Sequence, residues 1–190
     1  MNRIRVVFCG ETTVGKSSII QTFSGKHFSD QINSTVAGAF HSQFVRVNNE
    51  TVNLEIWDTA GSERYHSVIP NFFRNAGVVV IIFDLSRKET FSALDFWINF
   101  SHANAPEDTP FIVAGNKKDL VLENREISYD EANTYCKNAG ALAYFETSAK
   151  TGECIENLFI SISSVNPNSI ITQDTVSSQS VINLDRRSCC

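Results

Sequence analysis

The segment GETTVGKS, from Gly10 to Ser17, carries the residue types and the spacing of a phosphate-binding loop. Gly10 and Gly15 allow a tight turn whose backbone N–H groups converge on phosphate oxygens, beside the positive end of the following helix. Lys16 adds a full charge toward the β- and γ-phosphates, and the Ser17 hydroxyl can ligate Mg²⁺. A chance glycine loop is the alternative, but the strand-like run before the segment and the helix-compatible run after it disfavour that interpretation. The sequence therefore predicts a nucleotide site.

A further oxygen ligand for Mg²⁺ is expected from Asp58, in the segment WDTAG from Trp57 to Gly61. Asp58 follows the predicted strand Thr51–Ile56, and the carboxyl ends of strands in such a sheet face the ligand crevice. Taken alone, Asp58 is equally well explained as a turn residue at the end of a strand. The phosphate-binding loop favours the role of metal ligand.

Strands that could position these residues recur along the chain. Two half-buried strands, Phe40–Val47 and Thr51–Ile56, flank a predicted turn at Asn48-Asn49-Glu50. Further strand-length apolar runs lie at Ile4–Cys9, Val78–Phe83, Phe111–Ala114 and Ala143–Phe145. Helix-compatible segments separate them, so we expect an α/β fold of the P-loop NTPase kind. It would contain a six-stranded, mostly parallel sheet with one antiparallel hairpin strand, and helices on both faces.

Three of the expected helices show an apolar face or an end signal. Thr90–Phe100 and a final helix after residue 154 have apolar residues at helical spacing. Ser128–Asn138 begins with a capping box, because Glu131 stands three residues after the N-cap Ser128. The expected apolar faces consist of Phe91, Leu94, Trp97 and Ile98 in the first helix, and of Ile155, Leu158, Phe159 and Ile162 in the last.

Length and composition indicate one domain, residues 1–165, followed by a tail at 166–190. The tail is rich in Ser, Thr, Asn and Gln, so we expect residues 166–187 to be flexible. A net charge of −5 argues against nucleic-acid binding. No run is long enough to span a bilayer, and the start of the chain lacks the pattern of a signal peptide. We therefore expect a cytosolic, monomeric protein without a disulfide framework or a zinc site.

From about Arg3 to Val165 the chain resembles the Ras superfamily of small GTPases. Two segments carry this resemblance: NKKD, from Asn116 to Asp119, and ETSAK, from Glu146 to Lys150. A carboxylate at Asp119 can accept two hydrogen bonds from guanine that adenine does not offer. A solvated turn would explain the first segment alone, and a capping loop the second, but their joint occurrence in this order favours guanine recognition.

The resemblance assigns further residues to the bound GTP or GDP and its Mg²⁺. Asn116 would steady the base loop, the Lys117 stem would cover the guanine ring, and the Ala149 N–H would reach the guanine carbonyl. Thr35 would join Mg²⁺ beside Ser17 and Asp58, while the Gly61 N–H would sense the γ-phosphate. The remaining nucleotide contacts implied by the resemblance are Thr12, Thr13, Val14, Ser18, Phe28, Ser148 and Lys150. The implied catalytic residues are Lys16, Thr35, Gly61 and Ser62.

Within that superfamily the chain is most similar to Rab proteins, and among them to the early-endosomal branch. The segment SERYHSVIPNFFRNA, residues 62–76, resembles the second switch of Rabs. Three aromatic residues, Phe40, Trp57 and Phe72, match those that Rabs present to effectors, although ordinary core packing would also explain them. The chain ends in Cys189-Cys190, which resembles a double prenylation site rather than a C-a-a-X box.

The Rab resemblance implies a place and a set of partners. The expected place is the cytoplasmic face of vesicles or endosomes, with a cytosolic pool. The expected partners are effectors, an exchange factor, a GTPase-activating protein and prenyl-delivery chaperones.

The chain departs from the family pattern at the residue after DTAG, where Ser62 replaces the usual glutamine. That glutamine orients the attacking water, and a serine hydroxyl is too short to reach the same position. Thr12 and Thr13 add branched side chains near the γ-phosphate. We expect slow intrinsic hydrolysis, unless Ser62 holds a second water that substitutes for the amide. Two further interpretations stay open: a GTP-loaded scaffold that hydrolyses essentially nothing, and, from another class, a small-molecule kinase or ATPase.

Overall fold

The computed structural model describes residues 2–29, 35, 38–47, 50–61, 68–165 and 181–183. Its strands are β1 (Asn2–Cys9), β2 (Gly38–Val47), β3 (Glu50–Thr59), β4 (Val78–Asp84), β5 (Phe111–Asn116), β6 (Ala143–Glu146) and β7 (Val181–Asn183). Its helices are α1 (Lys16–Phe23), α2 (Pro70–Phe73), α3 (Lys88–Ser92), α4 (Leu94–Asn104), α5 (Val121–Asn124), α6 (Tyr129–Asn138) and α7 (Ile155–Ser163), with a 3-10 turn η2 at Lys118–Leu120.

The strands form one sheet in the order β6-β5-β4-β1-β3-β2-β7. All neighbouring pairs are parallel except β2 and β3, whose register pairs Gly38 with Thr59 and Val47 with Glu50. The predicted α/β class, the mostly parallel sheet and the single antiparallel hairpin strand are confirmed. Parallel strands need long crossover connections, and the helices supply them.

A seventh strand, β7, extends the six-stranded sheet that the sequence predicts. It comes from the tail and pairs in parallel with β2, so that Val45 stands opposite Ile182. The Ile182 side chain is half-buried and packs against the core. Two adjacent apolar residues, Val181 and Ile182, in a polar tail are too weak a signal to predict a strand.

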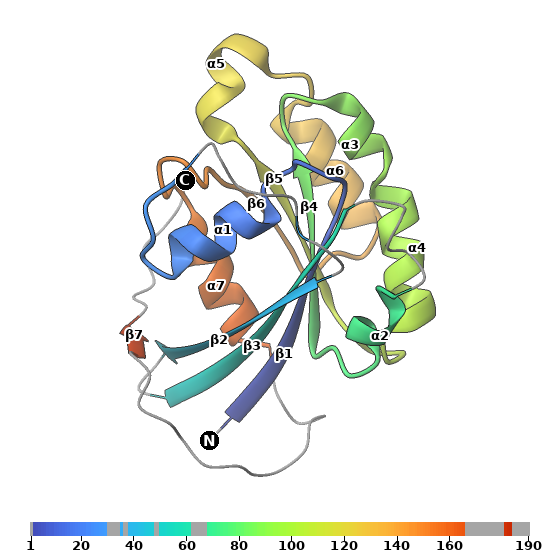
Figure 1. Ribbon diagram of the computed structural model, residues 1–190. Helices are drawn as coiled ribbons and strands as arrows, with labels where there is room; N and C mark the ends of the chain where they lie inside the picture. Colours follow the sequence, from blue (N-terminus) through green and yellow to red (C-terminus); the bar gives the residue numbers. More distant parts are fainter. Residues whose placement is uncertain are drawn as a thin grey trace.

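Helices cover both faces of the sheet (Figure 1), as the sequence predicts. On one face α1 and α7 pack over a cluster that includes Phe8, Ile20 and Phe159. On the other, α2, α4 and α6 cover a cluster that includes Phe73 and Trp97. The strand β4 lies between the two clusters and is buried along its whole length. No helix in the described part of the chain is long and apolar enough to cross a membrane.

Two element boundaries differ from those expected. The helix predicted at Thr90–Phe100 is split at Ala93 into α3 and α4, although Leu94, Trp97 and Ile98 are buried as predicted. Apolar spacing runs through Ala93 without interruption, so it gives no sign of the split. The strand β3 continues to Thr59, which places Asp58 within its last residues instead of in the loop after it.

The N-cap predicted for α6 is confirmed, because the Ser128 hydroxyl accepts a hydrogen bond from the Glu131 N–H at 3.2 Å.

Candidate functional site

The phosphate-binding loop connects β1 to α1 and depends on its two glycines. Gly10 has φ +133° and Gly15 has φ +97°, a region that side chains rarely adopt. A Cβ atom on Gly10 would lie 2.1 Å from the Ile82 carbonyl oxygen. Thr13 also has a positive φ, +61°, which is unusual for a β-branched residue and marks local strain. Thr12 and Thr13 are exposed, Ser18 is half-buried, and Val14 packs into the core.

The Lys16 ammonium is buried and lies inside the curl of this loop. Its Nζ donates hydrogen bonds to the carbonyl oxygens of Gly10 and Glu11, each at 2.7 Å. Burial lowers the pKa of Lys16 to about 8, against the opposing effect of nearby acidic groups, first among them Asp58. The loop therefore surrounds a cation whose positive charge is poorly solvated, which favours an anionic ligand.

Three oxygen-bearing side chains from separate segments converge beside the loop. The Ser17 hydroxyl lies 3.0 Å from the Thr35 hydroxyl and donates a short hydrogen bond to Asp58 Oδ2. The Thr35 hydroxyl lies 3.3 Å from the same oxygen. The other carboxylate oxygen of Asp58, Oδ1, is buried and has no hydrogen-bond partner among the described residues. Burial raises the pKa of Asp58.

This donor set fits Mg²⁺, which prefers hard oxygen ligands and binds through few protein groups. A buried carboxylate oxygen without a partner is costly unless a cation or a ligand satisfies it. The three predicted metal ligands, Ser17, Thr35 and Asp58, are thus brought together by the fold.

The segment after Asp58 passes directly against the phosphate-binding loop. A Cβ atom on Gly61 would lie 2.4 Å from both the Glu11 carbonyl carbon and the Thr12 nitrogen. Glycine is therefore required for this close approach, which puts the Gly61 backbone next to the loop. Ser62 lies outside the described residues.

The two predicted base loops meet at Asn116. Its side-chain amide donates to the Val14 carbonyl at 2.9 Å, and its Oδ1 accepts from Thr147 and from the Ala149 N–H, both at 3.2 Å. Asn116 thereby ties both base loops to the phosphate-binding loop. The Ala149 N–H, expected to reach guanine, bonds within the protein here.

Two of the residues expected around the base, Asp119 and Ser148, contact each other. Asp119 Oδ1 accepts a 2.6 Å hydrogen bond from the Ser148 hydroxyl. Phe28 is 37% exposed and Lys150 is also exposed, so both side chains are accessible. A bidentate ion pair between Arg125 and Glu146, with N–O distances of 2.9 and 2.7 Å, holds the second base loop in place.

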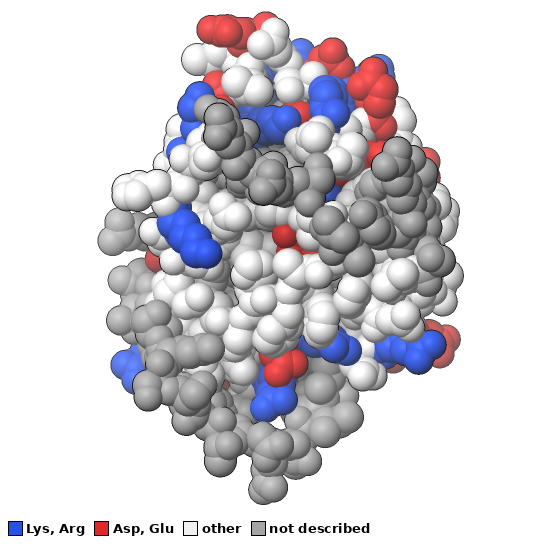
Figure 2. Space-filling model, viewed as in Figure 1, with Lys and Arg blue, Asp and Glu red and all other residues white. Residues whose placement is uncertain are grey.

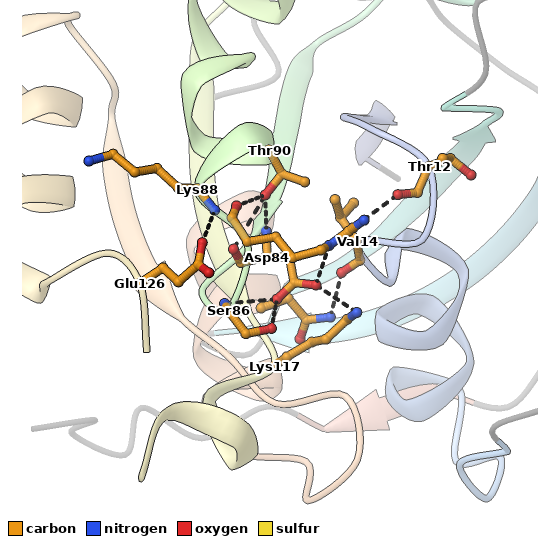
Figure 3. A network of polar contacts seen from close by, with 10 residues as sticks. Thr12, Val14, Asp84, Ser86, Lys88, Thr90, Lys117 and Glu126 are labelled. Carbon is orange, nitrogen blue, oxygen red and sulfur yellow. Dashed lines mark hydrogen bonds and ion pairs between the residues drawn. The ribbon is translucent and has the colours of Figure 1, made fainter. Parts of the chain in front are cut away.

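Sequence reasoning missed a buried carboxylate, Asp84, at the end of β4. Asp84 and Lys117 point toward each other (Figure 3), and the Lys117 Nζ lies 2.7 Å from Asp84 Oδ2. The same oxygen accepts from Arg87 Nε at 2.9 Å. Burial alone would raise the pKa of Asp84, but hydrogen bonds from Lys117 and Ser86 outweigh it and lower the pKa. A charged residue closing an otherwise apolar strand was the available signal.

A second contact that the sequence does not indicate joins the phosphate-binding loop to α4. The Trp97 indole N–H donates to Glu11 Oε1 at 3.0 Å. Trp97 was predicted only as a core residue, and its ring is indeed buried.

The three aromatic residues predicted to meet effectors lie in a row, with Phe40 tilted against Trp57 and Trp57 stacked on Phe72. Ring centroids are 5.1 Å apart between Phe40 and Trp57, and 5.0 Å apart between Trp57 and Phe72. Phe40 is 52% exposed, which excludes core packing as its main role, while Trp57 and Phe72 are half-buried. On the face that Figure 2 shows, few charged side chains of the described residues lie over the middle of the sheet.

Comparison with known proteins agrees with this geometry. The family model described as "Ras family" matches residues 5–166. The chain is 39% identical over 159 residues to the GTP-binding protein ypt5 of Schizosaccharomyces pombe, a match that covers 83% of this chain and 75% of that protein. It is also 39% identical to the Ras-related protein Rab5A of Oryza sativa subsp. japonica, covering 83% and 78%. Identity to the Ras-related protein Rab-31 of Rattus norvegicus is 38%, covering 86% and 83%.

Proposed function

The chain belongs to the Ras family of small GTPases and to its Rab group, most similar to Rab5-type members, and from this membership we propose that it is a slow GTP/GDP switch. Membership implies GTP-switched regulation of endosomal traffic. The finer proposal is that the GTP state persists and recruits effectors, because intrinsic hydrolysis is weak.

The convergence of Ser17, Thr35 and Asp58 is the observation that carries the switch. These residues come from α1, from the segment before β2 and from β3, so a metal–phosphate ligand would draw separate segments together. Bound Mg²⁺ would supply positive charge that stabilises the negative charge of the phosphates. Loss of the γ-phosphate would release the segment that carries Thr35 and the segment after Gly61.

Other residues have roles that follow from their positions. Lys16 and the backbone N–H groups of the loop would bind the phosphates, and Asp119 would select guanine over adenine. The Asp119 loop favours this function over a small-molecule kinase or ATPase. Competition of ATP against bound GTP distinguishes the two, since an ATPase would exchange its nucleotide for ATP.

Weak hydrolysis is proposed because Ser62 stands where the family has a water-orienting glutamine. We expect Ser62→Gln to speed single-turnover GTP hydrolysis tenfold or more, equivalent to about 1.4 kcal/mol of activation barrier. Both proteins are loaded with GTP and Mg²⁺, and Ser62→Ala serves as the control that removes the hydroxyl without adding an amide. Equal rates for wild type and Ser62→Gln would show that the missing glutamine does not limit hydrolysis.

A second candidate, a GTP-loaded scaffold without turnover, is favoured by Ser62 together with the branched side chains of Thr12 and Thr13. The same assay separates the two functions. A switch converts its GTP slowly but completely, whereas a scaffold retains intact GTP until the nucleotide dissociates.

Membrane attachment is proposed through lipids on Cys189 and Cys190, which lie outside the described residues. Two lipids are needed for stable anchoring, since one chain binds membranes only marginally. Mass spectrometry of the full chain from eukaryotic cells should find two prenyl groups, and replacing both cysteines by serine should move the protein to the soluble fraction.

A further inference from the structure

Asp84 is a fully buried carboxylate at the end of β4 whose two oxygens are both occupied. Oδ1 accepts from the Ser86 backbone N–H at 2.9 Å and from the Ser86 hydroxyl at 2.7 Å. Oδ2 accepts from Arg87 Nε and from Lys117 Nζ, at 2.9 and 2.7 Å. Asp84 therefore fixes two cations, and one of them, Lys117, belongs to the first base loop.

The Arg87 side chain continues from Asp84 to the phosphate-binding loop. Its Nη2 donates to the Thr12 carbonyl oxygen at 3.1 Å, while its Nε stays on Asp84. A continuous path of polar contacts thus runs from Thr12 through Arg87 and Asp84 to Lys117. Figure 3 labels Thr12, Asp84 and Lys117 along this path. The two contacts use different nitrogens of the guanidinium, Nε and Nη2, which a rigid plane holds apart. A lysine carries all its donors on one nitrogen, so it cannot place donors at both positions.

We propose that Arg87 is a positioning residue that couples the phosphate-binding loop to the first base loop and thereby slows the release of bound guanine nucleotide. The inference rests on the nucleotide binding proposed above. A nucleotide held by its phosphates in one loop and by its base in another leaves fastest when the two loops separate. The contact between Asn116 and Val14 resists separation in the interior, and the path through Arg87 resists it from the solvent side, where its side chain is 38% exposed.

The test compares release of a fluorescent GDP from the full chain with Mg²⁺ in wild type, Arg87→Ala, Arg87→Lys and Lys88→Ala. Hydrogen bonds to charged groups are stronger than neutral ones, and partial exposure weakens them, so we expect release from Arg87→Ala to be about tenfold faster. Lys88→Ala is the matched control, since it removes one positive charge at the next position. The Lys88 side chain points away from Asp84 (Figure 3), and its release rate should stay within about twofold of wild type.

Arg87→Lys separates the two contacts of the guanidinium. It retains a cation beside Asp84 but loses the fork that reaches Thr12, so its release rate should lie close to that of Arg87→Ala. A rate equal to wild type for Arg87→Lys would overturn the coupling, because an ion pair with Asp84 alone would then suffice. So would an unchanged rate for Arg87→Ala.

Hydrogen exchange distinguishes coupling from a general loss of stability. Arg87→Ala should speed amide exchange in residues 10–17 and 116–120 while leaving β5 residues 111–115 unchanged. Faster exchange throughout the sheet would reduce Arg87 to a structural role and overturn the proposal. The exchange measurement needs no ligand, so the inference stays testable if the wild type binds no GDP, a result that would refute the proposed function instead.

Discussion

At Asp58, one buried carboxylate oxygen is held by hydroxyl groups and the other has no partner among the described residues. Burying an ionised carboxylate is unfavourable unless each oxygen finds a donor or a cation. Burial raises the pKa of Asp58, while the hydrogen bond from Ser17 and the charge of Lys16 act against that rise. A divalent cation bound to Oδ1 would compensate for the burial of the ionised carboxylate.

The substitution Asp58→Asn keeps the shape of the side chain but removes its charge. EDTA should speed GDP release from the wild type at least tenfold, because the metal links the phosphates to the protein. Release from Asp58→Asn should be fast already and respond to EDTA by less than about threefold. Asp108→Asn, at an exposed position, should behave as wild type. A full EDTA response in Asp58→Asn would remove Asp58 from the metal site.

Local spacing was sufficient to identify the residues of the motifs. Gly10, Lys16 and Ser17 lie within one short segment, and their chemistry depends on that spacing, so their roles could be predicted before any contact was known. Arg87 and Asp84 could not be assigned this way. Arg87 contacts Thr12, 75 positions away in the sequence, and Asp84 contacts Lys117. A residue's own neighbours in sequence carry no information about such pairings.

At the scale of elements, the phosphate-binding loop is supported by a helix that belongs to the opposite face of the sheet from α1. The indole of Trp97 on α4 donates to the Glu11 carboxylate at 3.0 Å. The chain has one other tryptophan, Trp57, whose indole N–H is buried without a partner among the described residues. The two tryptophans therefore form a natural pair for comparison.

We expect Trp97→Phe to lower the free energy of unfolding by about 2–4 kcal/mol, since it removes a hydrogen bond to a charged group and leaves a small cavity. Trp57→Phe should lower the free energy of unfolding by at least 1 kcal/mol less than Trp97→Phe does, about the value of one hydrogen bond. The Trp57 indole N–H has no partner among the described residues, so its removal breaks no hydrogen bond there. Urea unfolding with saturating GDP and Mg²⁺ measures both. Equal costs would mean that the contact between Trp97 and Glu11 contributes no net stability.

Element types were predicted more reliably than element limits. Apolar runs and helical spacing located β4, β5 and α7, because burial on both faces or on one stripe imposes those patterns. A capping box marked the start of α6. The division between α3 and α4 at Ala93 left no trace in the pattern, since apolar spacing continues through it. The end of β3 was also misplaced, because Asp58 and Thr59 are polar residues that nevertheless pair within the sheet.

At the scale of the whole molecule, the row formed by Phe40, Trp57 and Phe72 joins β2, β3 and α2 across the surface. The Gly38 backbone allows this packing, because a Cβ atom there would lie 2.8 Å from the Phe72 ring. The row adjoins the segments that a γ-phosphate would order, so a partner that binds it could sense the nucleotide.

We expect Phe40→Ala to weaken binding of GTP-loaded protein to an effector by tenfold or more, about the loss of one interface hot spot, without changing GDP release. Phe96→Ala, which truncates a similarly exposed aromatic ring on α4, is the control. Pull-down with a Rab5-type effector and the fluorescent GDP assay provide the two measurements. Equal binding by both variants would place the effector surface elsewhere.

The pairing of β7 with β2 has a mechanical consequence for a lipid-anchored form of this protein. Cys190 lies 25 residues after Val165, so a linker that starts at Val165 can span at most about 90 Å when fully extended. Cys190 lies only 7 residues after Asn183, where β7 ends, so a linker that starts there can span at most about 25 Å. While β7 stays paired with β2, the edge of the sheet that carries β2 would be held close to the bilayer. If the strand detached, the same domain could reach several times farther from the bilayer.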